Sequence, residues 1–277
     1  MSTLLQVSDP HFGAEWPAAV DALVTLAATL RPDLVVLSGD LTQRARRRQF
    51  EAARAFVERL GPQALLAIPG NHDIPLFDPV ARLCRPYARY RHAFGADLEP
   101  VFDAPALLVQ GVNTTRPARH TAGEISAAQI ERVARRFELA QPAQLRVAVV
   151  HQPIAGAGPR KPRDRLHGSE AALRRWADAG VDLILGGHTH RPEINAVEMA
   201  GSTRRIYAIQ GGTAVSRRVR DGRPNSVNLI AYEGASTGAR RVLVTRYDHD
   251  AAGGRFVASE TRVLDLTPAA DGASEQR

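Results

Sequence analysis

Cysteine is scarce in this chain, and long apolar runs are missing from it. One cysteine, Cys84, stands among 277 residues, which excludes an intrachain disulfide framework and favours a reducing compartment. No run approaches the roughly 18 consecutive apolar residues of a membrane span. The start of the chain passes at once into the strand-like Leu4–Val7, without the basic and apolar segments of a signal peptide. We therefore expect a cytoplasmic protein with no membrane span.

Lysine and aromatic residues are also rare. Lys161 is the only lysine among 36 basic residues, the formal net charge is +7, and aromatic residues make up 5% of the chain. Guanidinium groups suit an anionic substrate because they present a planar fork to phosphate oxygens. A general arginine bias on solvated helix faces explains the surplus more simply, and we favour it. The cluster formed by Arg44 and Arg46–Arg48 lacks interleaved aromatic residues, so we expect no nucleic-acid partner.

The first two-thirds of the chain alternates short apolar runs with amphipathic stretches, a pattern typical of an α/β domain. The predicted strands are Leu4–Val7, Leu34–Leu37, Leu65–Ile68, Ala106–Val112, Arg146–Val150 and Leu183–Leu185. The predicted helices are Pro17–Leu30, Arg44–Leu60, Val80–Phe94, Ser126–Leu139 and Ser169–Ala179. Ser126, followed three positions later by Gln129, resembles a capping box at the start of the fourth helix. The strands show little polar alternation, which predicts burial on both faces.

From about Glu193 onward the helical pattern ends, and turn signals separate five further strands. These are Ile194–Met199, Ser202–Ile209, Ser226–Tyr232, Arg240–Tyr247 and Phe256–Leu264, which we expect to form an antiparallel sheet. We predict a single domain over residues 1–266 and a disordered tail over residues 267–277. The segment 155–167, rich in Gly, Pro and Arg, is predicted to be a loop that influences substrate choice.

Five of the predicted strands are followed by residue types that bind metals. These residues are Asp9 and His11, then Asp40, then Asn71, then His151, and finally His188 and His190. Ligands of open α/β sheets bind beyond the carboxyl ends of the strands, so we expect all seven side chains to converge at one edge. Oxygen and imidazole ligands without a thiolate suit Mn, Fe or Zn, and seven ligands match two divalent or trivalent ions better than one tetrahedral zinc.

The backbone around these residues carries further expectations. In Asp9-Pro-His11 and in His188-Thr-His190 an extended backbone would direct both ligands to the same side. Pro10 is expected to keep Asp9 extended. Gly39, Gly70, Gly186 and Gly187, which precede ligands, are expected to allow tight turns.

In this order the motifs resemble those of the calcineurin-like metallophosphoesterase superfamily: D-x-H, G-D, G-N-H-D, H and G-H-x-H. Here they read Asp9-Pro10-His11, Gly39-Asp40, Gly70-Asn71-His72-Asp73, His151 and Gly187-His188-Thr189-His190. Among the branches of the superfamily, the chain is most similar to the bacterial class III cyclic nucleotide phosphodiesterases. The resemblance implies a four-layer α/β/β/α sandwich of two mixed sheets flanked by helices.

The resemblance also implies roles for individual residues. Asp9, His11, Asp40 and His190 would hold one ion, and Asp40, Asn71, His151 and His188 the other, with Asp40 bridging the two. Asn71 and His72 would contact the substrate phosphate, and His72 would stabilise or protonate the leaving oxygen. Asp73 would orient His72. A metal-bound hydroxide would attack phosphorus in line.

The sequence leaves the substrate open. A small phosphodiester of the 3′,5′-cyclic nucleotide type is the first hypothesis. The same site would serve a glycerophosphodiesterase, another phosphoesterase or a nuclease, although the capping domain and coiled-coil insertions of the superfamily's DNA-end nucleases are missing. A metal-free scaffold like the retromer subunit is a further alternative, but such scaffolds have lost ligands and all seven are present here. A homo-oligomer stays open.

Overall fold

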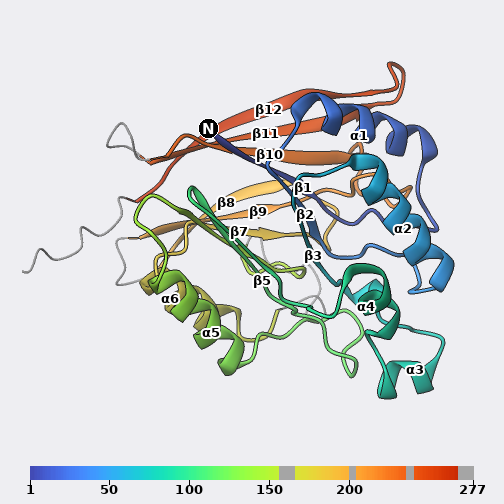
Figure 1. The fold of residues 1–277 in the computed structure, drawn as a ribbon, viewed down its shortest axis with the longest axis horizontal. Coiled ribbons are helices and arrows are strands. Elements are labelled where there is room, and N and C mark those ends of the chain that lie inside the picture. Colours follow the sequence, from blue (N-terminus) through green and yellow to red (C-terminus); the bar gives the residue numbers. More distant parts are fainter. Residues whose placement is uncertain (156–165, 200–203, 235–239, 268–277) are drawn as a thin grey trace, which may run out of the picture.

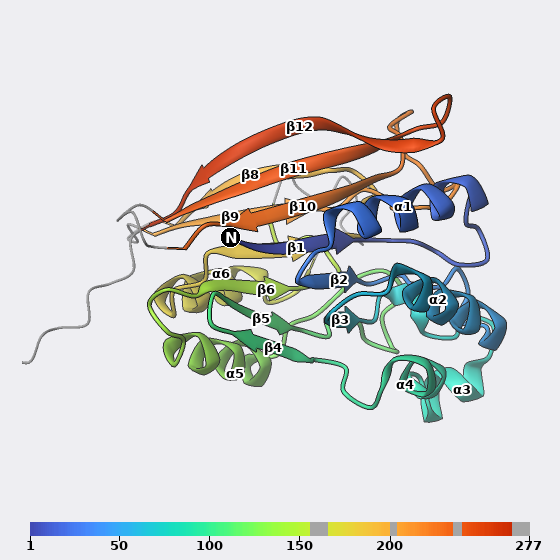
Figure 2. The same cartoon turned by 45° about the horizontal axis from the view of Figure 1, so that its top comes forward.

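Two six-stranded mixed sheets form the centre of the molecule in the computed structural model, which describes residues 1–155, 166–199, 204–234 and 240–267 (Figure 1). The first sheet has the spatial order β12 (Arg255–Asp265), β11 (Arg241–Asp250), β10 (Ser226–Tyr232), β1 (Ser2–Val7), β2 (Leu34–Ser38) and β3 (Leu65–Ile68), as Figure 2 shows. The second has the order β4 (Val101–Ala104), β5 (Leu107–Gly111), β6 (Leu145–Val149), β7 (Leu183–Gly186), β9 (Arg205–Gln210) and β8 (Glu193–Glu198).

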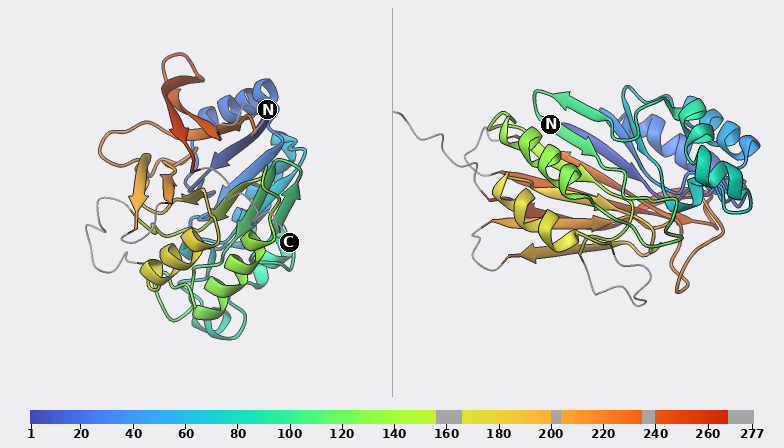
Figure 3. Two further views of the ribbon diagram at one scale, coloured as in Figure 1. Left: turned by 90° about the vertical axis from the view of Figure 1, so that its left-hand side faces the viewer. Right: turned by 90° about the horizontal axis from the view of Figure 1, so that it is seen from below.

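Helices cover the outer faces of both sheets, which gives the predicted α/β/β/α layers (Figure 3). The helices are α1 (Pro17–Leu30), α2 (Arg47–Leu60), α3 (Pro79–Cys84), α4 (Ala88–Phe94), α5 (Ala127–Glu138) and α6 (Ser169–Asp178), with the 3₁₀ turn η1 (Asn71–Asp73). The first sheet packs against α1 and α2, and the second packs against α5 and α6.

Each central strand is buried on both faces, as its apolar sequence predicts. In β2, Leu34 and Val36 join the core between the two sheets, whereas Val35 and Leu37 join the core beneath α1 and α2. Alternate side chains point to opposite faces of a strand, so one apolar run serves two cores. Trp176 of α6 is fully buried beneath the second sheet, and burial of a large apolar side chain contributes about 1.5–3 kcal/mol.

The strand pairing brings the predicted motifs to one edge. Strands β1, β2 and β3 are parallel neighbours, and so are β5, β6, β7 and β9. Their carboxyl ends therefore lie on the same side of each sheet. No helix in the described ranges is both long enough and apolar enough to cross a membrane.

One expectation for the first two-thirds of the chain is wrong, and one strand was not expected. The helix expected over Val80–Phe94 is split into α3 and α4, because Pro86 disfavours helical backbone at Arg85, where α3 ends. Strand β4 was not predicted; it is a short edge strand that pairs antiparallel with β5. The capping box expected at Ser126 is present at the start of α5, where the Ser126 side chain accepts from the Gln129 amide.

The expected separate antiparallel sheet after Glu193 is also wrong. Strands β10, β11 and β12 extend the first sheet, whereas β8 and β9 extend the second, and β9 pairs in parallel with β7. Pairing with strands that are distant in the sequence decides this division: β10 pairs with β1, and β9 pairs with β7. The expected tail and loop fall largely on residues 268–277 and 156–165, which lie outside the described residues. The domain boundary at residue 266 stays a prediction.

Candidate metal centre

The seven predicted ligands meet where the carboxyl ends of the two sheets come together. The first sheet contributes Asp9 and His11 after β1, Asp40 after β2, and Asn71 at the start of η1 after β3. The second sheet contributes His151 after β6, and His188 and His190 after β7. All except the partly buried His188 are buried. Residues separated by up to 181 positions in the chain thus form one cluster.

The cluster divides into two groups that share Asp40. Asp9, His11, Asp40 and His190 form one group, and Asp40, His151 and His188 form the other. Within each group the candidate ligand atoms lie within 4.8 Å of one another. Asn71 adjoins the second group, because its Oδ1 lies 3.3 Å from His151 Nε2.

Asp40 directs a different carboxylate oxygen to each group. Its Oδ2 lies 3.6 Å from His11 Nε2, and its Oδ1 lies 3.3 Å from His151 Nε2. Asp40 Oδ1 also accepts a hydrogen bond from the His72 amide at 2.7 Å, which fixes the carboxylate. Asp40 is therefore shared by the two groups, with one carboxylate oxygen toward each.

Two of the histidines have their ring orientation fixed by backbone carbonyls. His151 Nδ1 lies 2.9 Å from the Ser38 carbonyl, and His190 Nδ1 lies 2.6 Å from the Arg218 carbonyl. A carbonyl can only accept, so Nδ1 carries a proton and Nε2 faces the cluster, where its lone pair can bind a metal once the ring is neutral. Such carbonyl partners are usual behind metal-bound histidines.

Five of the seven ligands adopt left-handed backbone: Asp9 (φ 50°), His11 (φ 46°), Asp40 (φ 52°), His188 (φ 71°) and His190 (φ 58°). The backbone was expected to be extended in Asp9-Pro-His11 and in His188-Thr-His190, and Asp9 was expected to be extended because Pro10 follows it. Both expectations are therefore wrong. Positive φ is costly for residues other than glycine and persists where the surroundings enforce it, typically at functional sites.

The neighbouring glycines serve close packing more than turning. Of the four that precede ligands, only Gly39 has positive φ, at 98°. A Cβ on Gly70 would overlap Asp40, and one on Gly187 would overlap the side chains of Ser8 and Asp9. These positions lack side chains because the ligand side chains occupy that space.

Burial and neighbouring charges act against each other in the pKa values of the cluster. Burial raises the pKa of Asp40, but His151 and His72 lower it by more, so that the pKa lies well below its usual value. Burial lowers the pKa of His151, and Asp40 raises it by more, to about 9. For His11 burial prevails, and the pKa is lowered well below its usual value.

These residues fit two metal ions. Carboxylate oxygens, imidazole nitrogens and one amide oxygen are ligands for Mn, Fe and Zn, and thiolates are not among them. His11 Nε2 and His190 Nε2 lie 3.0 Å apart with Asp9 Oδ1 close to both, so lone pairs from several residues point at one position. The donor set supports a metal-binding cluster and leaves the identity of the metal open.

His72 has other partners than the sequence suggested. Its Nδ1 lies 2.8 Å from the Gln43 carbonyl, and its Nε2 lies 3.1 Å from Arg218 Nη1. Asp73, expected to orient His72, instead accepts from the amides of Gly70, Leu41 and Thr42 at 2.8–3.0 Å. Asp73 thus holds together the loops that follow β2 and β3, and Gln43 orients His72.

The sequence analysis missed a segment that supports the cluster from behind. Thr213 Oγ1 donates to the Asp9 carbonyl at 2.6 Å, and the Arg218 carbonyl accepts from His190. This segment follows β9, whose carboxyl end lies at the same edge because β9 is parallel to β7. Ligand sites of α/β sheets lie beyond the carboxyl ends of parallel strands, so a parallel β9 would have indicated that the segment after it lies at the site. The sequence pattern did not reveal that β9 is parallel to β7.

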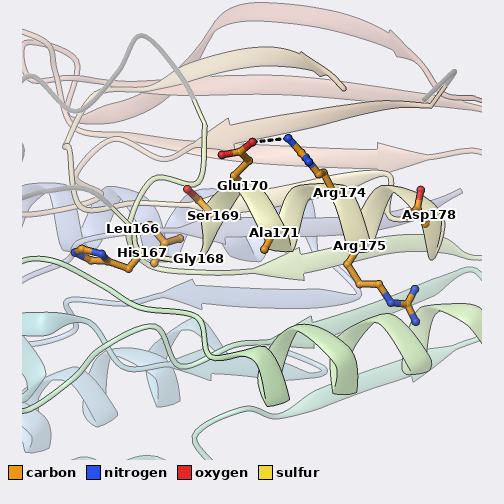
Figure 4. A pocket seen from close by; sticks show the side chains of 9 residues that line it. All are labelled: Leu166, His167, Gly168, Ser169, Glu170, Ala171, Arg174, Arg175 and Asp178. Carbon is orange, nitrogen blue, oxygen red and sulfur yellow. Dashed lines mark hydrogen bonds and ion pairs between the residues drawn. The ribbon is translucent and has the colours of Figure 1, made fainter. Parts of the chain in front are cut away.

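A hollow of about 710 Å³ lies elsewhere, along α6, and is lined by residues from Leu166 to Asp178 (Figure 4). Glu170 and Arg174 form an ion pair across one turn of this helix. None of the seven ligands lines the hollow, so it is not part of the metal centre.

Comparison with known proteins agrees with the geometry. The family model for calcineurin-like phosphoesterases matches residues 2–192. A probable cyclic nucleotide phosphodiesterase of Synechococcus is 28% identical over 201 residues, which cover 68% of this chain and 73% of the relative. A cAMP/cGMP dual specificity phosphodiesterase of Mycobacterium tuberculosis is also 28% identical, and the match covers 68% of this chain and 61% of that protein.

Solved structures share the fold. A dimetal phosphatase from Danio rerio has a TM-score of 0.65 at 13% identity, and the match covers 96% of this chain and 99% of that one. A purple acid phosphatase from yellow lupin has the same TM-score at 12% identity over 94% of this chain and 53% of that one. The chain belongs to the calcineurin-like phosphoesterase family, and this membership supports a metal-dependent phosphoester hydrolase.

Proposed function

We propose that the chain is a dinuclear-metal phosphodiesterase that hydrolyses a small phosphodiester of the 3′,5′-cyclic nucleotide type. One observation carries the proposal: Asp40 directs its two oxygens to two separate ligand groups. The names of the two relatives support the choice of a cyclic nucleotide. A cytoplasmic location belongs to the same proposal, since it agrees with a single cysteine.

Two bound ions would supply positive charge that polarises the phosphate and lowers the pKa of a water molecule. In the proposed assignment Asp9, His11, Asp40 and His190 hold one ion, and Asp40, Asn71, His151 and His188 hold the other. Ser38 and Arg218 keep the rings of His151 and His190 in the orientation that presents Nε2. The chain thereby fixes the donor atoms before substrate binds.

Asn71 and His72 are proposed to face the substrate phosphate. The Gln43 carbonyl accepts from His72 Nδ1, so Nε2 has a lone pair and accepts from Arg218. To protonate a leaving oxygen, His72 must therefore first take up a proton. A ribose oxygen is a poor leaving group and needs that proton, whereas nitrophenolate does not.

Substrate profiling tests the proposal directly. The Mn-loaded protein is assayed with cyclic nucleotides, glycerophosphodiesters, a nitrophenyl diester and the matching monoester. Higher catalytic efficiency on the diesters, and on cyclic nucleotides above glycerophosphodiesters, is expected. A monoester advantage would assign the chain as a phosphatase, and a glycerophosphodiester advantage would replace the cyclic nucleotide.

A further inference from the structure

Arg218 holds a guanidinium group beside the candidate metal centre. It lies in the segment between β9 and β10 and is partly buried. Its Nη1 lies 3.1 Å from His72 Nε2 and 3.3 Å from Gln43 Oε1. In the described part of the chain, no carboxylate accepts a hydrogen bond from this guanidinium, although the charges of Asp40 and Asp9 act on it from a distance. Both side-chain partners are therefore neutral acceptors.

The backbone fixes where this guanidinium can lie. The Arg218 carbonyl accepts from His190 Nδ1 at 2.6 Å, and the Arg218 amide donates to Ser216 Oγ at 3.0 Å. Thr213 Oγ1 lies 3.1 Å from the same hydroxyl and donates to the Asp9 carbonyl. Asn225 Nδ2 donates to the Ser216 carbonyl at 2.8 Å. The main chain of Arg218 is thus tied to residues on both sides of one ligand group.

The chemistry of the contact between Arg218 and His72 assigns the donor. A guanidinium group can only donate, and the Gln43 carbonyl can only accept. His72 therefore donates from Nδ1 to Gln43 and accepts from Arg218 at Nε2. His72 and Gln43 both contact Nη1 of Arg218, and within the described ranges no other acceptor contacts its remaining N–H groups.

A partly buried cation with neutral partners suits an anion, because hydrogen bonds from a guanidinium to phosphate are charge-assisted and can be bidentate. Arg191, which lies near the same edge, pairs instead with Asp221. The next residue, Arg217, is exposed and lies over the ring of Trp16 at 5.5 Å. Arg217 therefore provides a matched control on the same segment.

We propose that Arg218 is a substrate-binding residue whose guanidinium donates to a non-bridging phosphate oxygen, and that His72 positions it. The proposal rests on the proposed function for the identity of the anion as a phosphodiester. It gives the neutral His72 ring a role separate from proton donation, namely holding the guanidinium toward the centre through the Nε2 lone pair. The side chain of Arg218 takes no part in metal retention, because only its backbone carbonyl contacts a ligand.

Binding of inorganic phosphate to the Mn-loaded protein tests the proposal without turnover. Calorimetric titration is carried out on the wild type, Arg218→Met, Arg218→Lys and the control Arg217→Met. Loss of a hydrogen bond to a charged group corresponds to about a tenfold to a hundredfold loss of affinity, which we expect for Arg218→Met. Arg218→Lys should recover part of the affinity, and Arg217→Met should bind as the wild type does.

Metal content and a double-mutant cycle complete the test. Arg218→Met should retain the metal content of the wild type, and His72→Asn combined with Arg218→Met should lose less affinity than the sum of the two single losses. The inference is overturned if Arg218→Met binds phosphate as tightly as the wild type does, or if Arg217→Met loses as much phosphate affinity as Arg218→Met. It is also overturned if Arg218→Met loses metal together with phosphate, or if the affinity losses of the two single variants simply add in the double variant. Absence of phosphate binding in the wild type would overturn it as well. Phosphate binding that depends on Arg218 in a protein without diesterase activity would refute only the proposed function.

Discussion

The two ends of strand β7 balance buried carboxylate charge in opposite ways. Asp182, just before the strand, is 1% exposed and receives hydrogen bonds at 2.7 and 2.9 Å from Arg240, itself 4% exposed, and at 2.9 Å from Arg204. Beyond the other end of the strand, Asp9 and Asp40 are equally buried, but their neighbours are histidines. Arginines neutralise the carboxylate at one end of the strand, whereas the carboxylates at the other end depend on imidazoles or metal ions for their counter-charge.

This difference separates structure from function. Burial lowers the pKa of Arg240, but its bonds to Asp182 raise it by more, so the guanidinium is charged at every ordinary pH. A histidine can lose its proton, and its lone pair then becomes a metal ligand. The charge of Asp182 is therefore neutralised by arginines alone, whereas the side chains around Asp9 and Asp40 can bind metal ions.

The largest contrast is expected between Asp40→Ala and Asp182→Asn in metal content and turnover. Asp40→Ala removes the shared candidate ligand, so both ions and turnover should be lost together. The loss should exceed the roughly 10- to 100-fold cost of removing a residue that only orients a metal ligand. Asn71→Ala should weaken chiefly one ion, and folded Asp182→Asn should retain the ions. Elemental analysis and turnover measure these effects. Two retained ions and substantial turnover in Asp40→Ala would exclude the bridge.

The second contrast concerns stability. Asp182→Asn leaves the buried Arg240 without its counter-charge, and removing one partner of a buried pair typically costs about 3–5 kcal/mol of unfolding free energy. Urea unfolding of the metal-free protein measures the loss. Asp21→Asn, which breaks an exposed pair with Arg59, is the control and should cost at most about 1 kcal/mol. Equal effects of the two substitutions would contradict the comparison.

The third contrast is pH dependence in the metal-free protein. The pKa of His151 is raised to about 9 in the fold, against about 6.5 in the unfolded chain. Its stabilisation is therefore complete below pH 6.5 and is lost as pH rises toward 9, by up to about 3 kcal/mol. Unfolding at pH 6.5 and pH 9 should show this loss in the wild type and a smaller one in His151→Gln. The cost of Asp182→Asn should be the same at both pH values.

The smallest expected effect is the stabilisation of the fold by each single metal ion. At a concentration 100 times its dissociation constant, one ion adds about 2.7 kcal/mol to the unfolding free energy. Mn should raise the melting temperature of the wild type and of Asp21→Asn but not of Asp40→Ala, and a chelator should reverse the rise. An equal rise in Asp40→Ala would indicate metal binding elsewhere in the chain.

The sequence determined the central layers because each strand carries its own burial signal. The apolar runs at Leu34–Leu37 and Leu65–Ile68 predicted β2 and β3 within one residue, and Ser126 with Gln129 marked the start of α5. The seven candidate ligands were also visible, since each follows such a run. These features depend on residues that are close together in the chain.

Only the tertiary structure decided the features that join distant segments. The division of the late strands between two sheets depends on the pairing of β9 with β7, and no local pattern encodes it. The left-handed backbone of Asp9 before Pro10 is enforced by packing against local preference. The position of Arg218 beside His72, 146 positions apart, follows from the same pairing. Contacts of this kind depend on the free energy of the whole packed fold. The sequence therefore indicated which residues are candidate ligands, and only the tertiary structure determined which residues contact them.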